Sequence, residues 1–331
     1  MSVIRRIFKS SAQREQAARD AEVADPIIDR LVAATDRRLA HLKGLRERLH
    51  APVLAARDTL RPAVGSIPGP TEVSPAAWPR NPTVKALFAR AEDAAAVFSN
   101  DRGTRAFFGG HPGCDCIALL ALETQEKQVL ASVMQGDIQA EVARTTVSFT
   151  NPRILAPSTD EAHVREELLL RALEYLALRG LQRVGAARAK RQELERDRAL
   201  LQAELRLAQR RGAGLGALEA GADTKSAAEL ERDLEAKVRE LEAGASGSLL
   251  PALLDAIVDV LMHPQDFLRI EPSTIAVDAM NFAVEPSATA APLEVAQLRL
   301  AQGPSFAVLL ARFPRVELRA DTRLAEAEKL L

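Results

Sequence analysis

One short segment of the chain combines side chains that could do chemistry. Residues 109–116 read GGHPGCDC, which places the imidazole of His111 and the thiols of Cys114 and Cys116 within six residues. Two thiols and one imidazole could supply three ligands to a zinc ion. A closed structural site needs a fourth ligand, and the chain contains no CxxC or HxxxH motif that would provide it.

The same residues also suit an ordinary structural role. On a β-strand, Cys114 and Cys116 would point to one face and Asp115 to the other, as expected for two small buried residues entering a sheet. We favour this packing role, so His111, Cys114 and Cys116 are only weak metal candidates. The chain has no GxSxG motif or other Cys–His pairing that would indicate a nucleophile. We therefore assign no catalytic residue, expect no cofactor and identify no small-molecule substrate.

Composition narrows the classes of function. The chain has 331 residues, 47% of them hydrophobic, and a formal net charge of −1. The chain can build a hydrophobic core, but its net charge creates no overall electrostatic field that would attract nucleic acid or an anionic membrane. Aromatic residues make up only 4%, which leaves few rings for unpaired bases to stack on. The two cysteines cannot form a disulfide framework and no secretory signal precedes them, so we expect a soluble, cytoplasmic protein that does not bind nucleic acid.

The strongest pattern is a pair of amphipathic helical stretches between about residues 188 and 242. Their apolar residues mirror each other about one point, pairing Leu194 with Leu241, Leu201 with Leu234, Leu205 with Leu230 and Ala208 with Ala227. The first stretch is net basic and the second is net acidic. An antiparallel coiled-coil hairpin would satisfy both the apolar seam and the charges beside it.

Several signals extend this hairpin to residues 158–264, with its tip at about 212–225. Capping boxes begin both arms, Ser158 with Glu161 and Ser226 with Glu229. The same register places three further apolar pairs together, Leu254 with Leu181, Ile257 with Leu178 and Met262 with Leu173. Gly180, Gly185 and Pro251 are predicted to be kinks.

Short apolar runs on both sides of the hairpin predict strands. They cover residues 116–122, 129–134 and 138–149 before it, and residues 267–270, 275–284, 293–300, 306–310 and 316–318 after it. We expect turns at residues 123–127 and at Gly136-Asp137, and a bulge within 275–284. One sheet built from both sets is the simplest solution, because two small sheets would each be marginal.

The N-terminal part is predicted to be helical. Asp25 and Pro26 resemble a helix start, and Pro52 should end or kink that helix. Asn81 and Pro82 predict another helix, reaching Phe98. The fold class is therefore α+β, a mainly antiparallel sheet domain with an inserted helical hairpin. Its parts are an N-terminal helical region (1–60), a proline-rich linker or strap (61–82), a helix with the first part of the sheet (83–157), the hairpin (158–264), and the rest of the sheet with a C-terminal helix (265–331).

This architecture favours a non-enzymatic adaptor or assembly protein that binds a protein partner or another copy of itself. The candidate contact residues are Arg191 and Arg198 on the seam and Leu215 and Leu218 at the tip. A rival hypothesis is a protein peripheral to the inner face of the membrane, anchored through residues 1–10 by Ile4, Ile7 and Phe8. A third is an enzyme whose site assembles around His111, Cys114 and Cys116.

Overall fold

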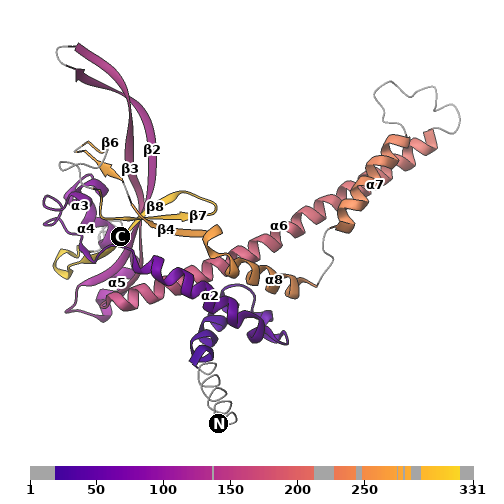
Figure 1. Ribbon diagram of the computed structural model, residues 1–331, viewed down its shortest axis with the longest axis horizontal. Helices are drawn as coiled ribbons and strands as arrows, with labels where there is room; N and C mark the ends of the chain where they lie inside the picture. Colours follow the sequence, from indigo (N-terminus) through magenta and orange to yellow (C-terminus); the bar gives the residue numbers. More distant parts are fainter. Residues whose placement is uncertain are drawn as a thin grey trace, which may run out of the picture.

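The computed structural model places helices on both faces of a mainly antiparallel sheet (Figure 1). It describes residues 19–135, 138–211, 227–243, 248–273, 275–278, 280–284 and 292–320. The predicted mixture of helices and mainly antiparallel strands is confirmed.

The main sheet joins strands from both sides of the long helices. Its order is β3-β2-β8-β7-β4, with β1 beside β8, and every pair except β1–β8 is antiparallel. Because β2 pairs directly with β8, the two predicted sets of strands do share one sheet. The strands are β1 (Thr71–Glu72), β2 (Cys116–Gln135), β3 (Ile138–Ser158), β4 (Leu268–Pro272), β7 (Ala296–Leu300) and β8 (Ser305–Phe313).

Strands β2 and β3 are longer than predicted. The turn expected at residues 123–127 is wrong, because these residues continue the ladder, with Glu123 opposite Thr150 and Lys127 opposite Thr146. Polar residues are tolerated there because Gln125, Glu126 and Lys127, which lie beyond the last β2–β8 pair, are exposed. The predicted turn Gly136-Asp137 lies outside the described residues, and the strands beside it pair as far as Gln135 and Ile138.

Two other predicted strands differ. Residues 275–284 form a small hairpin, β5 (Ala276–Val277) and β6 (Ala283–Val284), in place of one bulged strand. The Asp278 carboxylate accepts hydrogen bonds from the backbone N–H groups of Met280 and Phe282, which stabilises the turn between them. Residues 316–318 are not a strand, since the 3₁₀ turn η4 (Arg315–Glu317) occupies this position.

The N-terminal helices continue through three prolines, Pro26, Pro52 and Pro62. Residues 19–34 are helical, so the helix start expected at Pro26 is wrong. A 3₁₀ turn, η1 (Arg37–His41), follows, and then α2 (Leu45–Gly65) runs through both Pro52 and Pro62. The helix therefore does not end at Pro52, which was one of the two outcomes expected there. The apolar face of α2, which includes the buried Pro52 ring, packs on the long helices, and this burial outweighs the lost backbone hydrogen bonds.

The proline-rich segment is docked onto the sheet. We call residues 66–81 the strap. Leu310 donates its N–H to the Pro68 carbonyl (2.7 Å), and Val73 donates to Arg312 (3.0 Å), so the strap takes over the edge of β8 that β7 leaves. Gly69 has φ +117°, and a Cβ there would lie 2.3 Å from the Leu310 carbonyl oxygen. Only glycine allows this close approach.

Three short helices follow the strap, where one was predicted from residue 81 to 98. They are α3 (Pro82–Leu87), α4 (Ala91–Asn100) and α5 (Arg102–Gly110). The predicted start is confirmed, because the Asn81 side chain caps α3 by accepting from Val84. Asp101 caps α5 in the same way, accepting from Thr104.

The sheet separates two hydrophobic cores. Helix 19–34, α2, α6 and α8 cover one face, and α3, α4 and α5 cover the other. Alternation along the strands serves both cores: Leu119 and Ala121 of β2 face the first, and Leu120 and Leu122 face the second. The body is therefore a three-layer arrangement of helices, sheet and helices.

The described part of the insert between β3 and β4 contains three α-helices. They are α6 (Glu161–Arg211), α7 (Ala227–Ala243) and α8 (Leu249–Met262). Both α7 and α8 pack along α6, with α8 near the body and α7 near the outer end (Figure 1). Helix α6 is continuous through Gly180 and Gly185, and Pro251 lies in the first turn of α8, where a helix tolerates proline.

The predicted register at the base of the insert is wrong. Leu178 and Met262 are 38% and 51% exposed, so neither lies in the seam. Gly180 instead faces Ile257, where a Cβ would meet backbone atoms of Ile257 at 3.0 Å. Helix α8 is a separate element from α7, so the pattern of the outer arm does not determine how it sits on α6.

Arginines join the helices around this base. Asp255 and Asp259 of α8 pair with Arg48 of α2 and Arg183 of α6, so these acids lie on an outer, ion-paired stripe. Arg30 of helix 19–34 binds both Glu167 and Glu174 of α6. Its hydrogen bonds to Glu167, at 2.8 Å, lower the pKa of that carboxyl from 4.5 to about 2.

The Glu167→Gln variant is therefore expected to lose about 2 kcal/mol of unfolding free energy at neutral pH. A lowered pKa stabilises the fold above the unfolded-state value of 4.5, and this contribution disappears as the pH falls toward 2. Urea unfolding at pH 6 and pH 3 should show the difference between wild type and variant shrinking. Glu166→Gln is the control, because Glu166 is half exposed and lies 3.5 Å or more from Arg57 and Arg61. Equal effects of the two variants would contradict this role of Arg30.

Candidate interaction surfaces

The metal candidates do not form a cluster. His111 stacks on the Phe107 ring, and its Nδ1 lies 3.1 Å from the Phe107 carbonyl oxygen. Cys114 precedes β2 and is exposed, so the expectation that both cysteines are buried is wrong. Cys116 is buried in the sheet, and desolvation raises the pKa of its thiol to about 12. Within the described ranges, no group of three or more His, Cys, Asp or Glu residues could hold a metal ion.

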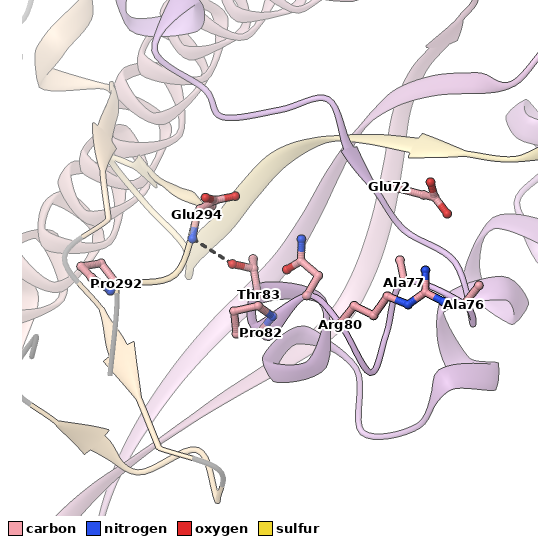
Figure 2. A pocket seen from close by; sticks show the side chains of 9 residues that line it. Glu72, Ala76, Ala77, Arg80, Pro82, Thr83, Pro292 and Glu294 are labelled. Carbon is pink, nitrogen blue, oxygen red and sulfur yellow. Dashed lines mark hydrogen bonds between the residues drawn. The ribbon is translucent and has the colours of Figure 1, made fainter. Parts of the chain in front are cut away.

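A pocket of about 440 Å³ opens beside the strap (Figure 2). The strap supplies Glu72 and Arg80, and the segment before β7 supplies Pro292 and Glu294. Two of its polar side chains are engaged in the fold: Glu72 binds Ser74 and Arg312, and the Thr83 hydroxyl accepts from the Glu294 backbone N–H at 3.0 Å. Among the described residues, no histidine or cysteine lines this pocket, so they offer no nucleophile with a paired base there.

A second, more open groove of about 730 Å³ lies between α4 and β3. Its carboxylates are helix caps. Asp93 accepts from the Arg90 backbone at 3.2 Å, and Asp101 accepts from the Thr104 backbone at 2.7 Å. Both acids thus serve local structure, and the groove also lacks the partners of an acid–base or nucleophilic site.

The outer rod is the more informative surface. We give this name to residues 188–211 of α6 together with α7. Two lysines connect its helices, Lys190 to Glu240 at 3.2 Å and Lys237 to Asp197 at 3.3 Å. The partners' numbers fall along one helix as they rise along the other, so the helices run antiparallel.

The apolar seam of the outer rod is thin. Leu194 and Leu230 are buried, and Leu201, Leu205, Leu234 and Leu241 are half-buried. On the outside of α6, Leu200 and Leu207 are 60% and 53% exposed. These two leucines are seven residues apart, so they lie on the same side of the helix. The sequence pattern identified the inner leucines and missed this outer pair.

The predicted contact residues lie in different surroundings. Arg191 binds Glu195 of its own helix at 3.0 Å. Arg198 is exposed. The tip residues Leu215 and Leu218, and the anchor residues Ile4, Ile7 and Phe8, lie outside the described residues.

A second projecting element, the ribbon, was not anticipated. It comprises residues 125–135 of β2 and 138–148 of β3, which extend beyond the end of β8 (Figure 1). Leu130 on the ribbon is 72% exposed, and Val129 and Val142 are each 38% exposed. Because a turn was expected at residues 123–127, one continuous ribbon was not predicted from the sequence.

None of the helices in the described ranges combines the length and apolar composition that crossing a bilayer requires. No family model, curated protein or solved structure is significantly similar to the chain. Any proposal of a function must therefore be argued from the surfaces described above.

Proposed function

We propose that the chain is a non-enzymatic, cytoplasmic adaptor or assembly protein. Residues 158–264 act as a coiled-coil hairpin that holds a contact surface for a protein partner away from the body. The observation that carries the proposal is the pair of exposed leucines, Leu200 and Leu207, on the outer rod.

The length and the thin seam of the outer rod support this proposal. Residues 188–211 would extend about 35 Å at ~1.5 Å per residue. A helix as short as α7 is marginal alone, and few leucines of the seam are fully buried. A partner that covered Leu200 and Leu207 would gain about 1.5–3 kcal/mol of binding free energy for each side chain that it fully buried. An element of this length and shape is better suited to contacting a protein partner at a distance from the body than to catalysis.

The double variant Leu200→Glu/Leu207→Glu is expected to lose partner binding by more than about tenfold while remaining folded. Glutamate is a good helix former, so the rod keeps its conformation while the apolar contact is lost. Binding can be measured by affinity capture from native cells with quantitative mass spectrometry. The matched control is Gln192→Glu/Ala199→Glu, which adds the same charge at the same spacing on exposed positions of α6. Retention of all partners by the leucine variant would contradict the proposal.

A further inference from the structure

We propose that the ribbon is a homodimerisation surface, in which the free edge of β2 pairs antiparallel with the same edge of a second copy of this chain. This surface is separate from the outer rod and does not depend on the function proposed for the rod.

The edge of β2 becomes free where β8 ends. The last β2–β8 pair is Thr124 with Ser305, and beyond it residues 125–135 pair only with β3 among the described residues. A strand added along this edge would continue the line of β8. The outer edge of β3 is less accessible, because Val147 donates its N–H to the Asn281 carbonyl at 2.9 Å and Arg144 binds Asp278 at 2.8 Å.

Among the described residues, the edges of the sheet near the body carry features that prevent further strand pairing. Near the body, β3 has two register shifts, with positive φ at Asn151 and Ala156, and prolines follow at 152 and 157. Bulges and prolines prevent the addition of a further strand. The opposite edge strand, β4, is only five residues long and ends at Pro272. Residues 125–135 contain no proline, and their pairing with β3 shows no register shift.

The exposed apolar residues coincide with this unprotected edge. Leu130 lies at the middle of residues 125–135 and is 72% exposed. A two-stranded ribbon is marginally stable in water, and a length of eleven residues extends it by about 35 Å at ~3.3 Å per residue. Pairing between two ribbons would give a four-stranded sheet in which Leu130 packs against Leu130 of the other copy.

The sequence of the edge is compatible with a second copy of the chain as the partner. If Leu130 lies opposite Leu130 of the other copy, residues 125–135 overlap completely, and glutamine meets glutamine at the ends, Gln125 opposite Gln135. The charged residues Glu126 and Lys127 then oppose Met134 and Val133, so no like charges meet. Registers centred on Glu126 or Lys127 would place like charges opposite each other, which is destabilising. A two-fold axis at Leu130 gives the closed symmetry typical of homodimers.

Cysteine cross-linking of the full chain tests this register. In a Cys114→Ser background, which removes the exposed native thiol, Leu130→Cys should form an intermolecular disulfide on mild oxidation, because directly opposed residues have Cβ atoms about 4.5–5.5 Å apart. Gln128→Cys is the matched control on the same exposed edge. In this register it is displaced from its counterpart by four residues, or about 13 Å, and should not cross-link. Equal cross-linking of both variants, or of neither, would overturn the proposal.

The mass in solution gives an independent test. Analytical ultracentrifugation should find a wild-type dimer, a dissociation constant raised more than about tenfold by Leu130→Lys, and an unchanged dimer in Leu200→Glu/Leu207→Glu. A monomeric wild type would refute the ribbon interface. Loss of the dimer in the rod variant but not in Leu130→Lys would also refute it and would assign self-association to the rod.

Discussion

The Gly180→Val variant is expected to be less stable than the wild type by about 3 kcal/mol. The Gly180 Cα lies so close to α8 that a Cβ would be 3.0 Å from the Cα, N and Cγ1 atoms of Ile257. Two of these atoms belong to the backbone, so α8 must move away from α6 as a whole. Overpacking of this kind costs about 1–3 kcal/mol, and the branched valine side chain should place the cost at the upper end.

Urea unfolding followed by circular dichroism measures this loss, and Gly185→Val provides the control. Gly185 lies five residues further along α6 with nothing within 4 Å of its would-be Cβ. Valine is a slightly better helix former than glycine, so this variant should stay within about 0.5 kcal/mol of wild type. Similar stabilities of the two variants would show that α6 and α8 do not approach closely at Gly180.

The Phe313→Ala variant should lose about 4 kcal/mol, the range expected when a buried aromatic side chain is removed from a core. Phe313 is fully buried at the end of β8, where its ring stacks on Phe98 at a centroid distance of 4.6 Å and lies 6.2 Å from Phe108. It thereby ties both α4 and α5 to the sheet. Alanine would leave a cavity between these three elements.

Phe313→Leu is the control for this cavity. Leucine fills much of the space and should cost no more than about 1.5 kcal/mol. Midpoints and slopes of urea unfolding curves distinguish the two variants. If alanine and leucine were equally tolerated, the α4–α5 layer would not depend on Phe313 for its attachment.

Some local signals predicted what depends on neighbouring residues. Asn81 caps α3 as its type and position indicated, because a cap satisfies backbone groups only three residues away. The strands on both sides of the insert share a sheet, because neither set alone offers enough pairing.

Long-range packing decided the rest. Pro52 and Pro62 end helices in short peptides, but the apolar face of α2 lies on α6 and α8 and holds the helix together. Residues 123–127 resemble a turn because they are polar, yet β3 pairs with them throughout. The role of Gly180 was hidden for the same reason, since only the position of Ile257 explains it. The outer leucines Leu200 and Leu207 became evident only once the place of α7 was known.

Strand β8 has a consequence for how the protein is made. It lies in the middle of the sheet, yet the β2–β8 ladder, in which Cys116 pairs with Phe313, cannot be completed until Phe313 has been synthesised. At a translation rate of about 5–20 residues per second, roughly 10–40 s separate the two on the ribosome. By the end of that interval the nascent chain carries the whole insert while its sheet is still open, and contacts of such high sequence separation also form slowly. Newly synthesised molecules will therefore be most vulnerable to aggregation before residue 305 emerges, and chaperones should act on the chain in that interval.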